Sequence, residues 1–406
     1  MIKKHIFNIF ILLLLSITPS FAINDFVVKL GIDVLYESNF EIIKNKNVAL
    51  LANLSSRTRF GEQTAEIMAK SNRFKLVKIF TPEHGYYSII PAGKAVNDNV
   101  IFGINAISLY GKDRKPSPEL LKNVDIIVVD IQDVGIRSYT YISTVYNVLE
   151  AAAENNIKVI ICDRPNPLSG NLVDGNVLKL NNKSFIGIAP IPYIHGCTVG
   201  ELANIFVNEK YINSANKLDF QIIKMENWDR DFTWEQTGLT WYPTSPNIPT
   251  VNAIRGAALL GVFGELRIFN IGIGTSLPFQ YLFFTNPNIK INEKIFDLDE
   301  NGIIITKLYN SSINNLPGIL LNFDAEYSPR LYTFGFKILG MLLEQKPNFI
   351  AITKLEDRDK EMFIKAVGNS EIFDEITNFR STDLLLEKVN EGLVQFLNMR
   401  LRYLLY

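Results

Sequence analysis

The sequence predicts an α/β protein with two parts: a Rossmann-like N-terminal domain built on a parallel sheet, and a smaller α+β C-terminal domain. From residue 30 to about residue 225, short runs rich in Val and Ile alternate with helical patterns. This alternation is typical of a parallel sheet covered by helices on both faces. At residues 241–250, three prolines fall within ten residues, which excludes regular structure and indicates a domain boundary.

The alternating segments define the expected elements in chain order. In the first domain we expect strands at residues 48–51, 76–80, 106–110, 125–131, 158–162, 191–194 and 220–225, and helices at 64–71, 139–155 and 198–208. Beyond the boundary we expect strands at 302–307 and 318–323, and helices at 329–345, 357–366 and 382–397. The strands are runs of β-branched residues, as at 157–161. Helix 198–208 opens with a capping box, Thr198 and Glu201.

The first 22 residues are interpreted as a signal peptide. Lys3 and Lys4 precede an apolar run at residues 6–17, and small residues follow up to Ala22. The run is shorter than the roughly 20 residues that a membrane span needs. We therefore expect cleavage after Ala22, no stable membrane span afterwards, and a periplasmic or secreted protein. The mature domains are then residues 23–250 and 251–406.

Composition excludes several classes of protein. With 47% hydrophobic residues, the chain is not intrinsically disordered. Basic and acidic residues nearly cancel, 41 against 42, so no nucleic-acid partner is expected. No Gly-x-Gly-x-x-Gly, Cys-x-x-Cys or His-Glu-x-x-His occurs in a fitting place, so no dinucleotide cofactor and no metal is expected. Cys162 and Cys197 are either two buried thiols or a disulfide.

Polar residues follow five of the predicted strands, at the edge where parallel sheets bind ligands. They are Asn53, then Glu83 and His84, then Asp130 and Asp133, then Asp163, Arg164 and Asn166, and finally His195. Right-handed crossovers would place all five strand ends on one rim.

Among these residues Glu83 is the strongest candidate for a catalytic residue. A carboxyl group in a partly apolar pocket can serve as a general acid, although a Glu capping the next turn would look the same in sequence. Asp130 and Asp133 could act as a pair of catalytic acids or bind a metal ion. Alternatively, each could form an Asx turn at the strand end. Arg137, followed by Tyr139, would clamp an anionic group or form a surface salt bridge.

Taken together, the motifs resemble the NamZ-type exo-β-N-acetylmuramidases over essentially the whole mature chain. The matching segments are Pro82-Glu83-His84-Gly85, Asp130-Ile131-Gln132-Asp133-Val134-Gly135, Tyr139-Thr140-Tyr141, Asp163-Arg164-Pro165-Asn166-Pro167, His195-Gly196 and Ser245-Pro246-Asn247-Ile248-Pro249-Thr250. The resemblance implies a Rossmann-like N-terminal domain and a smaller C-terminal domain, with the site in a cleft. It also implies release of terminal N-acetylmuramic acid from the non-reducing end of peptidoglycan fragments, either a disaccharide or a muropeptide.

The resemblance and the residues together suggest roles for individual side chains. Glu83 matches the proposed catalytic carboxylate, and Asp130 or Asp133 would act as nucleophile, as base, or as stabiliser of the substrate's acetamido group. The expected substrate-binding residues are His84, Arg137, Tyr139, Asp163, Arg164, Asn166, His195, Asn247 and Glu265.

The chain departs from the family pattern in the second domain. A Glu and an Arg of the family are replaced by Ile271 and Ile273, so one candidate partner for the lactyl carboxylate of muramic acid is absent and Arg137 or Arg164 would take its place. Two alternatives therefore stay open. One is a periplasmic protein that binds wall sugars and is either non-catalytic or of drifted specificity; the other is a metal-dependent hydrolase using Asp130, Asp133, His84 and His195.

We predict that the exported protein begins at Ile23, because signal peptidase cleaves after small residues such as those ending at Ala22. N-terminal sequencing of the exported protein tests this. An intact Met1 would contradict the prediction.

Overall fold

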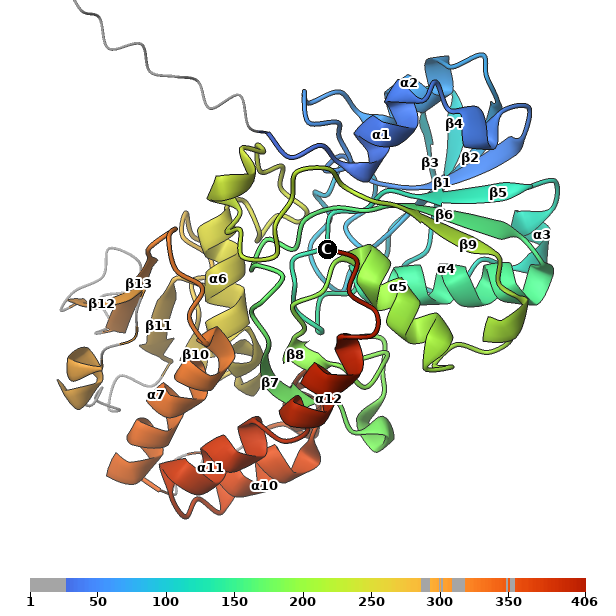
Figure 1. Cartoon of the computed structure of the whole chain (residues 1–406). Coiled ribbons are helices and arrows are strands. Elements are labelled where there is room, and N and C mark those ends of the chain that lie inside the picture. Colours follow the sequence, from blue (N-terminus) through green and yellow to red (C-terminus); the bar gives the residue numbers. More distant parts are fainter. Residues whose placement is uncertain are drawn as a thin grey trace, which may run out of the picture.

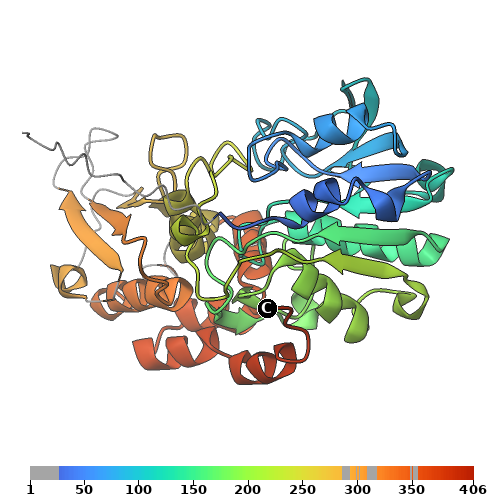
Figure 2. The ribbon, with the colours of Figure 1, turned by 45° about the horizontal axis from the view of Figure 1, so that its top comes forward.

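The computed structural model describes residues 27–406 except 286–292, 299, 301, 309–317, 348–349 and 351–354. The predicted signal peptide, residues 1–22, lies outside the described residues. Two lobes stand side by side in both ribbon views (Figures 1 and 2): a blue-to-green lobe around a large sheet, and a yellow-to-red lobe of helices with a small sheet. Within the described part of the chain, no helix is long and apolar enough to cross a bilayer.

A sheet of seven strands lies at the centre of the first lobe. It is mostly parallel, as the sequence predicts. Its order is β3(Asn99–Ile101), β4(Ile104–Ser108), β2(Lys75–Thr81), β1(Asn47–Leu51), β5(Ile126–Val129), β6(Lys158–Cys162) and β9(Phe220–Ile223). All neighbours are parallel except β3 and β4. The chain order reverses between β1 and β5, and ligands bind beside such a reversal in open α/β sheets.

Helices cover both faces of this sheet (Figure 1). One face carries α1(Gly31–Glu37) and α2(Thr64–Lys70); the other carries α4(Tyr141–Asn155) and α5(Val199–Asn208), with the short α3(Pro118–Leu121) at its end. The central strands β1, β5 and β6 are buried nearly throughout, which explains their continuous Val and Ile runs. The predicted capping box at α5 is confirmed, since Thr198 and Glu201 each accept a hydrogen bond from the other's backbone.

The prediction that residues 191–194 form a strand of the large sheet is wrong. This segment is β8(Pro192–Ile194), which pairs antiparallel with β7(Asp174–Val177) in a separate two-stranded sheet. Pro192 has no amide hydrogen to donate, which confines such a residue to strand ends and edges. His195 therefore does not follow a strand of the large sheet, and only four of the five expected strand ends share its rim.

The second lobe is α+β, as predicted. Its antiparallel sheet has the order β10(Phe269–Asn270), β11(Tyr281–Phe284), β13(Gly318–Phe323) and β12(Ile303–Leu308). Its helices are α6(Val251–Leu260), α7(Leu331–Gln345), α9(Asp357–Val367), α10(Ser370–Thr377), α11(Thr382–Val389) and α12(Leu393–Arg400), and a 3₁₀ segment, Gly261–Leu266, follows α6.

The single helix expected at 382–397 is instead broken into α11 and α12. Gly392 lies between them with φ 86°. A side chain there would meet Val177, because an added Cβ would lie 2.9 Å from the Val177 Cβ. The break thus lets α12 pack against β7 of the neighbouring sheet.

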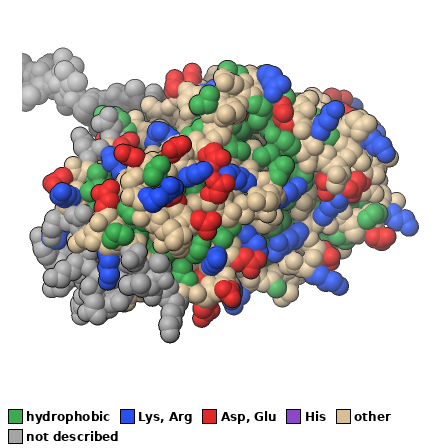
Figure 3. Space-filling view, turned by 90° about the horizontal axis from the view of Figure 1, so that it is seen from below, with side chains coloured by type: hydrophobic (Ala, Val, Ile, Leu, Met, Phe, Trp, Pro, Cys, Tyr) green, Lys and Arg blue, Asp and Glu red, His purple; other side chains and the backbone are tan. Residues whose placement is uncertain are grey.

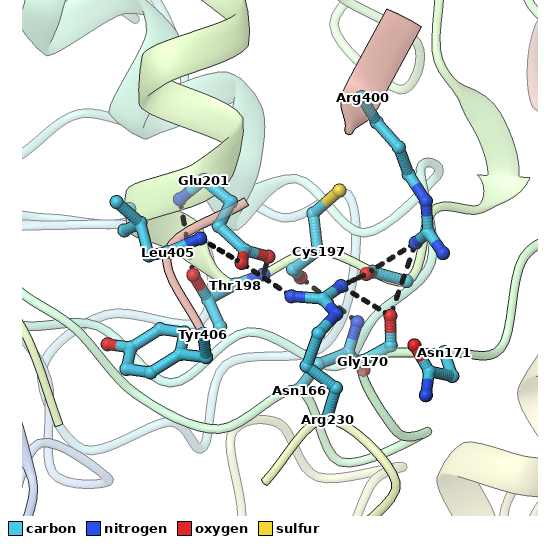
Figure 4. Close-up of polar contacts among 12 residues, drawn as sticks. Asn166, Gly170, Asn171, Cys197, Thr198, Glu201, Arg230, Arg400, Leu405 and Tyr406 are labelled. Atoms are coloured by element: carbon cyan, nitrogen blue, oxygen red, sulfur yellow. Dashed lines mark hydrogen bonds and ion pairs between the residues drawn. The ribbon is translucent and has the colours of Figure 1, made fainter. Parts of the chain in front are cut away.

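After α12 the chain returns to the first lobe (Figure 4). Arg400 donates to the carbonyls of Gly170 and Gly196, and the Leu405 amide donates to the Glu201 carboxylate. Tyr406 donates its phenolic hydrogen to Asp163 at 2.9 Å. The last helix and tail therefore stabilise the first lobe although they follow the second in sequence. On the face shown in Figure 3, acidic and basic side chains are intermingled.

The buried side chain of Arg137 connects the two lobes through hydrogen bonds. Its guanidinium donates to the carbonyls of Asn176 and Ile191, each at 2.8 Å, and to those of Ala366 and Val367 at 3.3 and 2.6 Å. The last two carbonyls end helix α9, where the helix dipole favours a cation. Burial lowers the pKa of Arg137 to about 10, so the group still carries its charge at neutral pH.

We predict that Arg137→Met lowers the free energy of unfolding by about 3 kcal/mol or more, since each buried carbonyl left without a donor costs about 1–3 kcal/mol. Urea titration measures the change. Arg402→Met is the matched control, because the Arg402 side chain is 62% exposed and pairs with Glu209 at the surface; its cost should stay below about 1 kcal/mol. Equal losses in both variants would contradict the structural role of Arg137.

Candidate active site

A cavity of about 280 Å³ lies between the two lobes. The loops after β2 and β5 line it from the first lobe, and α6, the 3₁₀ segment Gly261–Leu266 and α9 line it from the second. Of the predicted site residues, five line this cavity: Glu83, His84, Tyr139, Asn247 and Glu265.

Glu83 is placed by a tight turn directly after β2. The next two residues, His84 and Gly85, have φ values of 72° and 71°, which reverse the chain at once. Such a conformation is uncommon for a residue with a side chain and is held by its surroundings. Here the His84 Nδ1 bonds to the carbonyl of Ile90 at 2.7 Å, which closes the loop that follows.

Two donors orient the Glu83 carboxylate. The Gly93 amide donates to Oε1 at 2.8 Å, and the Thr140 hydroxyl donates to Oε2 at 2.6 Å. Thr140 lies at the N-terminus of α4, where a negative charge is favourable. Tyr110 lies beside the carboxylate: its pKa is raised to about 12, chiefly by burial and then by the Glu83 charge. Glu83 therefore has a defined orientation in the cavity wall.

Tyr139, which precedes α4, forms part of the adjoining wall, and Tyr141 packs against it. Tyr139 donates to the Thr244 hydroxyl at 2.7 Å, and its ring packs edge-on against Tyr141 with centroids 4.7 Å apart. Tyr141 accepts from Asn53 at 2.7 Å and donates to the Thr244 carbonyl. These contacts connect the end of β1 to the proline-rich segment that carries Asn247.

Glu265 comes from the second lobe and is a second carboxyl group in the cavity. Burial raises its pKa, and the Asp359 charge adds to this, while Arg267 and Arg358 act in the opposite direction. Two carboxyl groups from different lobes thus share one cavity, with Glu83 on one side of the interface and Glu265 on the other.

Asp130 lies outside the cavity lining, in an ion pair with Arg164. Arg164 binds both of its oxygens, at 2.6 and 2.8 Å, and the Thr64 hydroxyl donates to it at 2.5 Å. Asp130 is fully buried and Arg164 is 4% exposed. The two residues therefore hold the ends of β5 and β6 together, and the geometry gives neither of them access to a ligand in the cavity.

Asp133 and His195 form a second buried pair outside the cavity lining. The His195 Nε2 lies 3.4 Å from an Asp133 oxygen, while the Cys197 amide donates to the other ring nitrogen. The same Asp133 oxygen accepts from the Gly135 amide at 2.7 Å. The pair closes the turn after β5 against the segment that follows β8.

Three more predicted binding residues have structural partners. Arg137 donates to four carbonyls, as described above. The Asn166 amide donates to the Cys197 carbonyl at 3.0 Å (Figure 4). Asp163 is fully buried and accepts hydrogen bonds from Thr198 and Tyr406. None of the three lines the cavity.

Cys162 and Cys197 are free, buried thiols, as one of the two open interpretations required. Burial raises the pKa of Cys197 to about 12. Among the described residues, no group of three or more His, Cys, Asp or Glu side chains is arranged to hold a metal ion. The four residues of the metal-hydrolase alternative are instead distributed over the Asp130–Arg164 pair, the Asp133–His195 pair and the His84 turn.

Sequence reasoning missed the residues that orient Glu83. Thr140 falls in a motif that carries the resemblance, but a hydroxyl group at the start of a helix is interpreted from sequence as a helix cap. Gly93 acts through its backbone, which leaves no side-chain signal. Ile271 is buried in the second core and Ile273 is 44% exposed; neither lines the cavity.

Comparison with known proteins identifies the family. The N-terminal model of the exo-β-N-acetylmuramidase NamZ matches residues 48–252, and the C-terminal model matches residues 258–406. The chain belongs to the NamZ family. The peptidoglycan β-N-acetylmuramidase NamZ of Bacillus subtilis is 33% identical over 385 residues, which cover 93% of this chain and 91% of that protein.

Two solved structures of DUF1343 family proteins from Bacteroides fragilis have the same fold as this NamZ family member. They superpose with TM-scores of 0.83 and 0.69 at 31% and 28% identity. Each comparison covers 93% of this chain and 99% of the other. The resemblance drawn from the sequence motifs is therefore confirmed at the level of the family and of the α/β fold.

Asp163 gives a pH-dependent prediction. Burial raises its pKa to about 6, above the roughly 3.9 of an unfolded chain. The folded protein therefore binds this proton more tightly, so the carboxyl adds stability as the pH falls through about 6 and loses that contribution as the pH rises again. Relative to Asp163→Asn, wild type should gain about 2 kcal/mol between about pH 7.5 and about pH 4.5.

Urea titrations at the two pH values measure this gain. Asp113→Asn, on an exposed loop, is the control and should show no such dependence. A constant difference between wild type and Asp163→Asn across the range would contradict the buried, proton-binding state of Asp163.

Proposed function

We propose that this protein is an exo-acting glycoside hydrolase that releases a terminal, non-reducing β-N-acetylmuramic acid residue from peptidoglycan fragments, with Glu83 as general acid. The observation that carries the proposal is the Glu83 carboxyl group, oriented by Gly93 and Thr140 at the wall of the interlobe cavity. Membership of the NamZ family supports the substrate class, since the B. subtilis relative is a peptidoglycan β-N-acetylmuramidase.

The size of the cavity supports action on a chain end. Its volume of about 280 Å³ lies just below the roughly 300–1,000 Å³ of small-molecule sites. A space of this size suits one sugar ring better than several. A terminal residue would enter the cavity, and the remaining fragment would stay outside it.

Glu83 is suited to protonate the leaving oxygen. A glycosidic bond breaks when a carboxylic acid donates its proton to that oxygen while positive charge builds on the sugar ring. The Thr140 hydroxyl can either donate to Glu83 or accept from it, because a hydroxyl does both. It can therefore remain bonded to Glu83 before and after the proton leaves.

Glu265 is the better-placed second carboxyl group. Asp130 and Asp133, the pair expected from the sequence, are bound to Arg164 and to His195, whereas Glu265 lines the cavity. We assign Glu265 the stabilisation of positive charge on the ring. A 2-acetamido sugar also carries a carbonyl oxygen that can attack its own anomeric carbon, and a nearby carboxylate would favour that step as well.

The proposed location is the periplasm or the exterior of the cell. The predicted signal peptide supports it, and so does the substrate class, because peptidoglycan lies outside the inner membrane.

We predict that Glu83→Gln retains the fold and lowers kcat on an unactivated disaccharide by about 10²- to 10⁴-fold, because the amide cannot deliver a proton. An aryl glycoside with a good leaving group needs less protonation, so its rate should fall less. Measuring kcat on both substrates separates lost acid catalysis from lost binding, which would reduce hydrolysis of both alike.

Glu119→Gln is the matched control for this substitution, because Glu119 is exposed on α3, away from the cavity. Its kcat should equal that of wild type. A Glu83→Gln variant that cleaves the disaccharide at the wild-type rate would remove Glu83 from the mechanism.

We predict that dialysis against EDTA leaves hydrolysis unchanged, because two carboxyl groups and a 2-acetamido substrate supply the chemistry without a metal. Assays before and after dialysis measure this. Activity that disappears with EDTA and returns with zinc or manganese would favour the metal-dependent alternative.

A further inference from the structure

The side-chain amide of Asn53 is buried at the end of β1 and lies outside the cavity lining. Its nitrogen donates to the Ser88 hydroxyl at 3.1 Å and to the Tyr141 hydroxyl at 2.7 Å. Its oxygen accepts from the backbone amide and the hydroxyl of Ser55, at 3.2 and 2.7 Å. Because a backbone amide can only donate, the Ser55 contact fixes which atom of the group is the oxygen. The orientation of the asparagine amide is therefore fully determined.

The two acceptors of the asparagine amide belong to the two segments that orient Glu83. Ser88 lies in the loop that runs from Glu83 to Gly93, whose amide donates to Oε1 at 2.8 Å. Tyr141 directly follows Thr140, whose hydroxyl donates to Oε2 at 2.6 Å. The two N–H groups of one amide thus bind the same two segments that bind the two oxygens of the carboxyl group.

The loop after Glu83 depends on such contacts for its shape. Ser88 is buried and has a φ of 58°, and His84 in the same loop has a φ of 72°. Left-handed conformations are uncommon for residues with a side chain and persist only where the surroundings hold them. The amide of Leu54, which follows Asn53, also donates to the Tyr86 carbonyl of this loop at 2.6 Å. The end of β1 therefore holds the loop at two points.

The second segment is held through Tyr141, the first residue of α4. Its side chain is fully buried, and its hydroxyl accepts from Asn53 and donates to the Thr244 carbonyl. Both capacities of the hydroxyl are used, so the start of the helix, and Thr140 with it, has a fixed position.

The sheet supplies a rigid support for these contacts. Strand β1 lies between β2 and β5, and Leu51 near its end is paired with Phe80 of β2. Asn53 and Glu83 therefore follow neighbouring strands, and a residue on such a support can keep a catalytic group within a narrow range of positions.

We infer that Asn53 is a positioning residue for Glu83: its amide fixes the distance between the loop that carries Gly93 and the helix start that carries Thr140. The inference rests on the proposed function, because Asn53 acts on the reaction only through the general acid. A small displacement of an acid from the leaving oxygen is costly, since a shift of about 1 Å can lower a rate by about 10²-fold.

The test begins with Asn53→Ala, which removes both N–H donors. We expect kcat on the unactivated disaccharide to fall by about 10- to 100-fold. KM should stay near the wild-type value, because Asn53 does not line the cavity. An aryl glycoside with a good leaving group needs less protonation, so its kcat should fall less. Equal losses on the two substrates, or no loss on either, would overturn the inference.

Asn369→Ala is the matched control. Asn369 is also a fully buried amide, but it lies in the second lobe, where its oxygen accepts from the Glu371 amide at the start of α10. This variant should lose stability and keep the wild-type ratio of kcat on the two substrates.

Two further variants each remove one acceptor of the asparagine amide, and they keep the inference testable if Asn53→Ala does not fold. Ser88→Ala releases the loop that carries Gly93, and Tyr141→Phe releases the start of α4. Each should lower kcat on the disaccharide more than kcat on the aryl glycoside. Wild-type kinetics in both variants would overturn the inference.

A double-mutant cycle separates positioning from a general structural defect. In the Glu83→Gln background there is no acid left to position, so adding Asn53→Ala should cause little further loss of kcat on the aryl glycoside. A structural defect would lower kcat by the same factor in both backgrounds. Equal factors would therefore overturn the inference.

Hydrogen exchange at the Gly93 amide separates this inference from the proposed function, because it requires no turnover. The Glu83 carboxyl group accepts from this amide, so its exchange should be faster in Asn53→Ala than in wild type and unchanged in Asn369→Ala. If Glu83→Gln cleaves the disaccharide at the wild-type rate, the proposed function fails, and exchange at Gly93 still decides whether Asn53 positions Glu83. If Glu83→Gln is impaired while exchange at Gly93 is unchanged in Asn53→Ala, the proposed function stands and the inference fails.

Discussion

The buried guanidinium of Arg137 is the interaction on which the interlobe arrangement depends. In the described contacts no carboxylate pairs with it. Carbonyl groups of both lobes accept its hydrogen bonds and stabilise its charge, including the C-terminal carbonyls of α9. Its chain neighbours Ile136 and Ser138 line the cavity, as does Ala366, whose carbonyl it binds. The same contact that joins the lobes therefore sets the distance across the cavity.

The buried charged side chains of this protein fall into two groups, one structural and one facing the cavity. Paired groups such as Asp130–Arg164 and Glu201–Arg230 hold loops and the C-terminal tail in place. The carboxyl groups that face the cavity, Glu83 and Glu265, have no guanidinium partner in the described contacts and stay available to a ligand. A carboxylate that is paired with Arg is already stabilised as an anion and is a poor proton donor. A carboxyl group held only by neutral donors can exchange a proton with the substrate.

The second lobe contributes more than a cover for the first. It supplies Glu265, and its last residues return to the sheet, where Tyr406 reaches Asp163. Stability of the first lobe and completeness of the site therefore both require the whole chain. Because the site combines both lobes, a change in their relative position would separate Glu83 from Glu265 without altering either lobe internally.

Sequence by itself determined the features that depend on neighbouring residues: the β-branched runs of the parallel sheet, the capping box of α5, and Glu83 in its turn after β2. Tertiary structure alone decided which polar residues reach the cavity. Arg164 lies far along the chain from Asp130, and Glu265 belongs to the other lobe, so no local pattern distinguishes a sequestered carboxylate from an available one. β8 shows the same limit, because a short apolar run does not reveal which strand it will pair with. Strand and helix periodicity are local properties, whereas ion pairing and strand partners follow from long-range packing.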